Sequence, residues 1–232
     1  MELSPDAIAV FRLGPVTINA TLAFTWAVMA LLTLAALAMR LGLSTGPEPS
    51  RLQSGWEALV ETVESQIGEI GADRPRRYLP FVATLFLFIL TCNVLAVVPG
   101  FRAPTGSLST AAALALCVLV AVPAFGIGDK GLRAYLADYL KPSPVMLPFN
   151  IIGELSRTVA LAVRLYGNVM SGAVIGAILL GVAPFLFPVA LELLGLLTGV
   201  VQAYIFAVLA MVYIASAVRS AQGGAASRNG ES

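Results

Sequence analysis

Apolar residues gather along this chain in long runs separated by short polar segments. A helix needs about twenty apolar residues to cross the roughly 30 Å hydrocarbon core of a bilayer. Five runs reach that length: Ile18–Met39, Tyr78–Val98, Leu108–Ile127, Val145–Ala183 and Leu186–Val218. The pattern predicts an all-α polytopic membrane protein, a single membrane domain over residues 1–232 with membrane helices at 18–39, 78–98 and 108–127.

The last two runs are too long for a simple perpendicular crossing. A helix over Val145–Ala183 would extend roughly 57 Å at 1.5 Å per residue, almost twice the thickness of the hydrocarbon core. The linker Pro184–Pro188 is short enough to fold the two runs against each other. Residues 145–218 are therefore predicted to form a long, strongly tilted helical hairpin.

The polar segment after the first run has a helical pattern of its own. Between residues 54 and 71, Trp56, Leu59 and Val63 recur at helical spacing, and glutamates such as Glu57 and Glu61 fill the other face. We predict an amphipathic helix that lies at the membrane surface or against a partner protein. Residues 220–232 have no apolar periodicity and are predicted to be disordered.

The composition excludes a soluble globular protein. Apolar residues make up 58% of the chain and charged residues 12%, and the mean hydropathy is +0.88. A net charge of +1 gives no reason to expect a nucleic-acid partner. Cys92 and Cys117 both lie within apolar runs, so we expect them to pack as small hydrophobic residues, without a disulfide, metal site or cofactor.

The distribution of basic residues predicts the orientation. If the runs cross the membrane alternately, one side receives only Arg12 and Arg102, whereas the other receives ten basic residues: Arg40, Arg51, Arg74, Arg76, Arg77, Lys130, Arg133, Lys141, Arg219 and Arg228. Cytoplasmic loops carry the excess of Lys and Arg. We therefore expect the amino terminus outside and the carboxyl terminus in the cytoplasm.

The first half of the predicted hairpin carries polar residues on one face. Glu154, Arg157, Arg164, Asn168 and Ser171 are separated by 3, 7, 4 and 3 residues, so they project within about 100° of one another. Arg164 is the most informative, because a guanidinium keeps its charge and is costly near the bilayer centre. We expect it to face a partner or a water-filled path.

Glu154 and Arg157 allow a second interpretation, in which they only neutralise each other across one helical turn. In the second half of the hairpin, Glu192 and Gln202 are polar exceptions. The two carboxylates, Glu154 and Glu192, are candidates for a proton or cation relay. One carboxylate near each end of the hairpin, with Arg164 between them, suggests two water-filled approaches separated by a positive barrier.

Several motifs resemble the a subunit of F-type ATP synthases. They are LAVRLYGN at Leu161–Asn168, QAYIF at Gln202–Phe206, and NVLAVVPG at Asn93–Gly100. The resemblance covers roughly Arg51 to Ala217. Arg157, preceded by Glu154, further resembles a divergent bacterial branch called N-type.

The resemblance implies a stator subunit in a bacterial inner membrane. Arg164 matches the essential arginine that faces the ion-carrying carboxylates of a rotating c ring, and Gln202 matches the glutamine packed beside it. Two half-channels would carry H⁺ or Na⁺ to and from the ring. The implied partners are the c ring, the peripheral-stalk b subunits and the rest of the complex. Because the chain has no phosphate-binding loop, ATP chemistry would belong to those partners.

The sequence departs from the family at two acidic or histidine positions. Ala173 stands nine residues after the essential arginine, and Gly195 stands seven before the glutamine. Glu192, one turn before Gly195, is the nearest replacement and is expected to serve the outer path. A secondary transporter or a membrane scaffold remains an alternative, although a scaffold would have no need of Arg164.

Overall fold

The structure is a computed structural model, and it confirms the all-α polytopic fold. It describes residues 9–13, 16–42, 61, 65, 75–98, 100–139, 145–182 and 187–219. Five helices are long and apolar enough to cross a membrane. These are α1 (Ala20–Gly42), α3 (Pro75–Leu95), α4 (Leu108–Lys130), α6 (Met146–Val182) and α7 (Phe187–Arg219).

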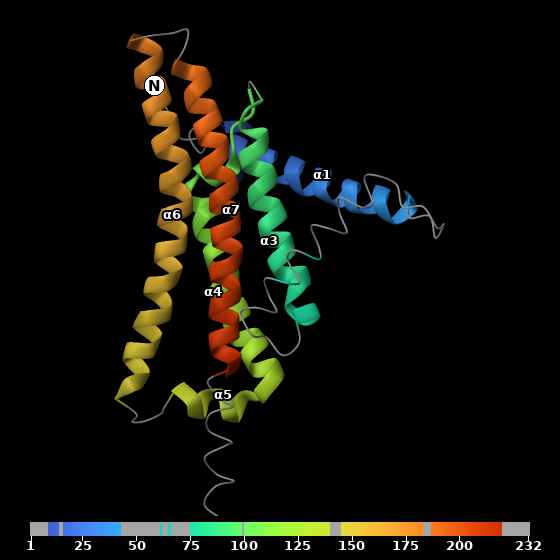
Figure 1. Cartoon of the computed structure of the whole chain (residues 1–232), viewed down its shortest axis with the longest axis vertical. Coiled ribbons are helices and arrows are strands. Elements are labelled where there is room, and N and C mark those ends of the chain that lie inside the picture. Colours follow the sequence, from blue (N-terminus) through green and yellow to red (C-terminus); the bar gives the residue numbers. More distant parts are fainter. Residues whose placement is uncertain are drawn as a thin grey trace, which may run out of the picture.

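Four of these helices form a bundle. In Figure 1, α3, α4, α6 and α7 run side by side, whereas α1 leaves the upper part of the bundle at a steep angle. The base of α1 is fixed by Phe24, whose ring packs edge-on against Phe101 with 4.9 Å between the centroids. The remainder of α1 exposes large apolar side chains, including Trp26 and Leu34.

Helix α7 lies at the centre of the bundle and contacts α3, α4 and α6. Small residues on α7, such as Ala203, Ala207 and Ala210, are buried and let the neighbouring backbones approach closely. Phe206 and Ile214 of the same helix are fully buried as well. This packing makes α7 the element against which the others are positioned.

Helix α6 lies at the edge of the bundle. Of its apolar window, 17% is buried, against 33% for α7. The two helices contain 37 and 33 residues, so they are roughly 55 and 50 Å long and exceed the hydrocarbon core as expected. Figure 1 shows them close together at the upper end and drawing apart towards the lower end.

Four short elements were not predicted. Strands β1 (Ala9–Leu13) and β2 (Val16–Asn19) form an antiparallel hairpin before α1. A single turn of 3-10 helix, η2 (Pro104–Gly106), precedes α4. Helix α5 (Leu132–Tyr139) crosses the lower end of the bundle between α4 and α6 (Figure 1).

Two predicted segments lie mostly or wholly outside the described residues. Only Glu61 and Ser65 of the amphipathic segment at 54–71 are described, and both are helical and exposed. The predicted disordered tail at 220–232 lies outside the described residues.

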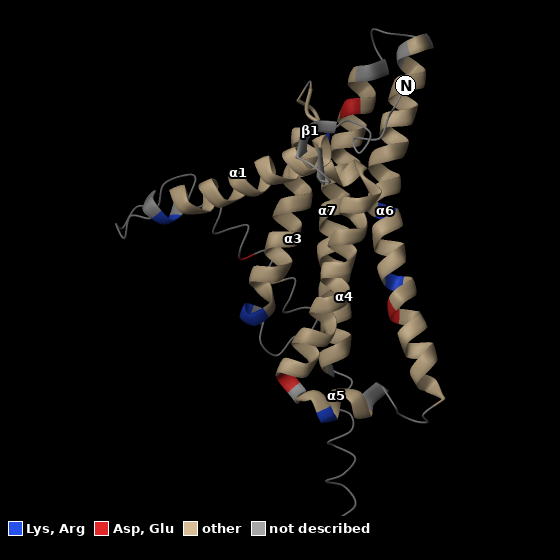
Figure 2. Ribbon diagram, turned by 180° about the vertical axis from the view of Figure 1, so that it is seen from behind, with Lys and Arg blue, Asp and Glu red and all other residues tan. Residues whose placement is uncertain are grey.

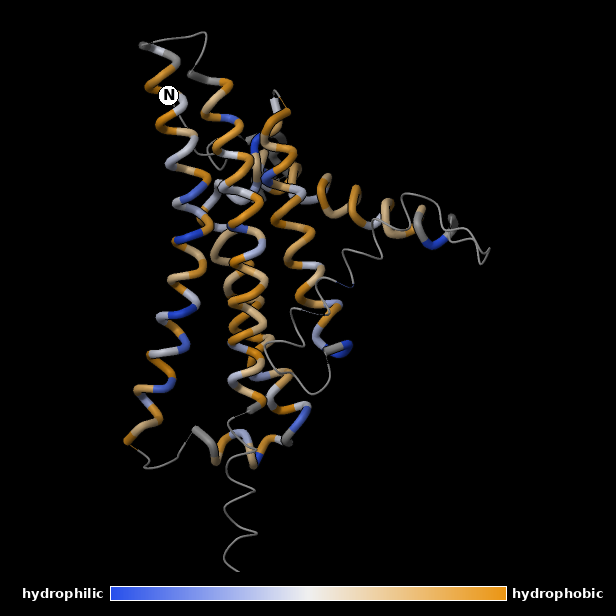
Figure 3. Tube along the Cα trace, in the orientation of Figure 1, coloured by the Kyte–Doolittle hydropathy of each residue, from blue (hydrophilic) through white to orange (hydrophobic). Residues whose placement is uncertain are grey.

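The lower ends of α3 and α4 are joined by polar contacts. Arg77 of α3 forms an ion pair with Asp129 of α4, and the Tyr78 hydroxyl donates a hydrogen bond to the same carboxylate. Figure 2 shows charged residues gathered at this lower end. Figure 3 shows that hydrophilic positions interrupt α6 through its middle, whereas α7 is apolar over most of its length.

Candidate functional site

The polar face of α6 is divided by the bundle into three environments. Leu161, Ala162 and Leu165 are buried and fix the side of α6 that packs inward. Arg164 is consequently exposed on the outward side. Residues within 149–158 of α6 line one cavity, which we call the lower cavity, and residues within 168–177 line another, the upper cavity. Arg164 lines neither.

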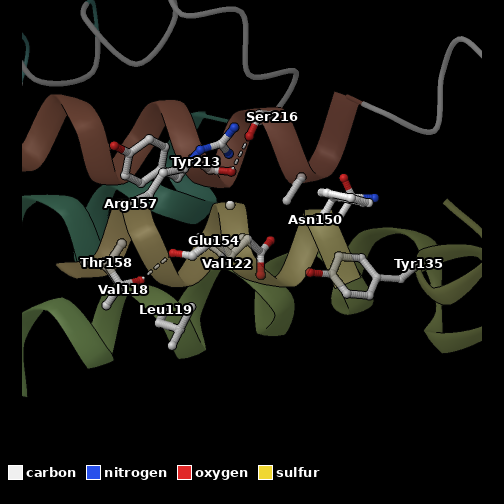
Figure 4. Close-up of a pocket in the computed structure, with 13 residues that line it drawn as sticks. Val118, Leu119, Val122, Tyr135, Asn150, Glu154, Arg157, Thr158, Tyr213 and Ser216 are labelled. Atoms are coloured by element: carbon white, nitrogen blue, oxygen red, sulfur yellow. Dashed lines mark hydrogen bonds between the residues drawn. The ribbon is translucent and has the colours of Figure 1, made fainter. Parts of the chain in front are cut away.

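The lower cavity, shown in Figure 4, has a volume of about 290 Å³. It lies at the end of the hairpin where α6 and α7 draw apart (Figure 1). Helices α4, α5, α6 and α7 all contribute to its lining. Its polar side chains are Tyr135, Asn150, Glu154, Arg157, Thr158, Tyr213 and Ser216.

Arg157 and Glu154 point to different walls of this cavity. The Arg157 guanidinium carbon lies 5.5 Å from the centre of the Tyr213 ring, a cation–π contact with α7. Figure 4 shows the Glu154 carboxyl group pointing instead towards Tyr135 of α5. The Thr158 hydroxyl donates to the backbone oxygen of Glu154 at 2.9 Å. The two side chains thus have separate surroundings.

The upper cavity has a volume of about 470 Å³ and lies between α3, α6 and α7. Asn168 of α6 and Glu192 of α7 both line it, as does Arg102 in the connection after α3. Ala173 and Gly195, the two positions at which the sequence departs from the family pattern, line the same cavity. Glu192 therefore shares one space with Ala173 and Gly195.

A buried amide that the sequence analysis did not select as a site residue forms part of the upper cavity. Asn93 of α3 donates through Nδ2 to the backbone oxygen of Gly199 on α7 at 2.8 Å. Its Oδ1 accepts from the Thr105 hydroxyl at 3.0 Å. These bonds tie α3, η2 and α7 together beside Glu192. An amide within an apolar run is the signal that could have identified Asn93.

The two cavities fix the register of the hairpin. The lower cavity joins residues 149–158 of α6 to 213–217 of α7, and the upper cavity joins 168–177 to 191–199. Because the helices are antiparallel, Arg164 lies at the level of α7 near Gln202. At 1.5 Å per residue it is separated from each cavity by roughly one to two turns of helix.

Gln202 and Arg164 share this level but differ in burial. Gln202 is 7% exposed, and its Nε2 has no hydrogen-bond partner among the described residues. Ser171, the last of the predicted face, is exposed, and its hydroxyl donates to the Asn168 backbone oxygen at 3.2 Å. Neither Gln202 nor Ser171 lines either cavity.

The arrangement suits ion passage better than metal binding. Within the described ranges, no group of three His, Cys, Asp or Glu residues could hold a metal ion. Each cavity instead contains one carboxylate accompanied by hydroxyl or amide groups. Carboxylates at membrane depth bind and release protons or cations, and a permanent positive charge between two such sites repels a cation moving directly from one to the other.

Residues 22–215 match the ATP synthase A chain family. The chain belongs to this family. It is 56% identical over 220 residues to ATP synthase subunit a 1 of Chlorobaculum parvum, covering 95% of this chain and 97% of the relative. It is 55% identical to ATP synthase subunit a of Albidiferax ferrireducens, covering 94% and 95% of the two chains.

A third relative, ATP synthase subunit a of Nitrosospira multiformis, is 53% identical over 94% of this chain and 86% of its own length. The resemblance to the a subunit of F-type ATP synthases is thereby confirmed. Family membership makes the chain a multi-pass membrane subunit of that complex. Assignment to the N-type branch remains a prediction.

Proposed function

We propose that this chain provides two ion half-channels and the fixed charge that couple ion translocation to rotation of a c ring. The observation that carries the proposal is the pair of separate cavities, one on each side of Arg164 along the hairpin. An ion reaching one cavity cannot pass directly to the other without crossing the level of the guanidinium. It must instead board a moving carrier at that level.

The exposure of Arg164 supports a partner on the outward side of α6. Small residues lie on this side of α6 among the polar ones: Ala160 and Ser171 are exposed, and Gly167 is half-buried. A surface of small residues lets another helix approach the backbone closely. The family resemblance supplies the partner, a ring of c subunits carrying carboxylates within the membrane.

Arg164 then acts by electrostatics. A guanidinium close to a ring carboxylate favours the charged form of that carboxylate, so the ring releases its proton or cation as it approaches. After passing Arg164, the carboxylate meets the other cavity and reloads. Arginine suits this role better than lysine, because burial can neutralise an ammonium group but not a guanidinium.

The two cavities are assigned to sides by the distribution of basic residues. Arg76, Arg77 and Arg133 lie at the lower end of the bundle, where Figure 2 shows the charge gathered. Since basic residues mark the cytoplasmic side, we assign the lower cavity to the inner path and the upper cavity to the outer path. Glu154 then serves the inner path, and Glu192 and Asn168 serve the outer path.

Purification from native membranes tests the partner. The chain should be recovered with a c ring and peripheral-stalk b subunits, and a cysteine at Ala160 should cross-link to a cysteine beside the ion-carrying carboxylate of the ring. Leu161 is adjacent but 1% exposed, so a cysteine there is the matched control and should not cross-link. Recovery of the chain alone, or equal cross-linking from both positions, would contradict the proposal.

A further inference from the structure

The lower cavity is bounded on one side by α5, a helix of eight residues. Of its described side chains, residues 132–137, five are exposed and Tyr135 alone is buried, with 7% of its surface exposed. Leu132 and Leu136, on the same helix, are more than half exposed. Tyr135 is therefore the residue by which α5 joins the bundle.

The position of the Tyr135 ring is set by a glycine on α4. A Cβ atom added to Gly126 would lie 2.6 Å from Cε2 of the ring, closer than two such atoms can approach. The backbone nitrogen of Tyr135 also donates to the Gly131 oxygen at 3.1 Å. Ring and backbone are thus both held, and the hydroxyl at the end of the ring is directed into the lower cavity (Figure 4).

In Figure 4 the Tyr135 hydroxyl and the Glu154 carboxyl group point towards each other across the cavity. The cationic side chain of this cavity, Arg157, has its guanidinium over the ring of Tyr213 on the opposite wall. A phenol that donates to a carboxylate forms a charge-assisted hydrogen bond, which is stronger and more directional than a neutral one.

We propose that Tyr135 is a positioning residue of the inner path, whose hydroxyl donates a hydrogen bond to Glu154 and holds that carboxyl group where a passing proton can reach it. This inference rests on the proposed function of the lower cavity. It makes α5 part of the path as well as a connection between α4 and α6.

The other ionisable groups of the cavity are few. Among the described lining residues, α6 contributes Arg157 besides Glu154, and α7 contributes Tyr213. Helix α4 contributes Val118, Leu119 and Val122, which do not ionise. Tyr135 is the lining residue from α5, so a change confined to its hydroxyl alters one contact of Glu154 and leaves the charge of the cavity unchanged.

The test is the substitution Tyr135→Phe in the whole complex. The ring that fits against Gly126 is retained, so assembly should be preserved. ATP-driven proton pumping should be measured per assembled complex as a function of the pH on the side of proton uptake. Loss of the hydrogen bond that holds the Glu154 carboxyl group in place should lower pumping several-fold and change its dependence on the pH of the uptake side.

Two comparisons make the result specific. In a Glu154→Gln background, Tyr135→Phe should have no further effect, and Leu136→Ala, which changes an exposed side chain of α5, should leave the profile as in the unmodified complex. A Tyr135→Phe profile that superimposes on the unmodified one would overturn the proposal. So would a further loss of pumping from Tyr135→Phe in the Glu154→Gln background, or an equal change in the profile from Leu136→Ala. If Glu154→Gln alters pumping while Tyr135→Phe does not, the proposed role of Tyr135 is wrong, and the proposal that the lower cavity is the inner path is retained.

Discussion

At the scale of single residues, the upper cavity contains one carboxylate close to two small residues. The resemblance led us to expect an acidic residue or a histidine at Ala173 and Gly195, and Glu192, one helical turn before Gly195, lines the same cavity. A carboxylate displaced by one turn on the same helix moves about 5 Å along the axis and remains on nearly the same face. We propose that Glu192 supplies the ionisable group of the outer path without any change in the fold.

Glu192→Gln tests whether this carboxylate carries ions. The amide keeps the size of the side chain but neither binds nor releases a proton at ordinary pH, so flux per assembled complex should fall by about tenfold or more. Its dependence on the pH of the outer solution should also change. Measurement of flux across pH, normalised to assembled enzyme, decides the question. An unchanged rate and profile would return Glu192 to a structural role.

At the scale of elements, the contact between α3 and α7 depends on a glycine. A Cβ atom at Gly199 would lie 2.9 Å from Cβ of Asn93, and neither helix backbone can give way cheaply. Gly199→Ala should separate the helices and weaken the bond from Asn93 to the residue 199 oxygen, with a cost of about 1–3 kcal/mol. The melting temperature of the purified complex should fall.

Gly195→Ala is the matched control for this prediction. It lies one turn away on the same helix, and an added Cβ would have no atom within 4 Å. Since alanine favours helix over glycine, its melting temperature should be unchanged or slightly higher. Equal destabilisation by both substitutions would show that close packing at Gly199 is not the cause.

The elements differ in how far the sequence could predict them. The five membrane helices follow from the length and apolar character of the runs, which a bilayer requires of any spanning helix. Helix α5 and the β1–β2 hairpin were not predicted from the sequence, because they are short and have no long periodic pattern. Tyr135 could not be selected from the sequence, because its contact with Gly126 depends on the position of α5.

The candidate site was predictable in part for the same reason. Helical spacing placed Glu154, Arg157, Arg164 and Asn168 on one face of α6, but spacing within one helix contains no information about its neighbours. The division of that face into two cavities depends on where α4, α5 and α3 meet the hairpin. The turn of Arg157 towards Tyr213 likewise depends on α7.

At the scale of the whole molecule, the bundle separates two cavities by a short stretch of α6 that contains a permanent positive charge. Family membership leaves little room for the alternatives of a secondary transporter or a scaffold. In this stretch Ala160 of α6 is exposed, and Gln202 lies buried on α7 at the same level. The central claim is that this charge couples ion passage to rotation.

ATP-driven proton pumping by the assembled complex carrying Arg164→Ala tests that claim most directly. Because Arg164 is exposed on the outward side of α6, its removal should leave the fold and assembly of this chain largely intact. Pumping should fall to background, and Arg164→Lys, measured beside it, should be severely impaired because a lysine can lose its charge when buried. Near-normal pumping by assembled Arg164→Ala complexes would contradict the account.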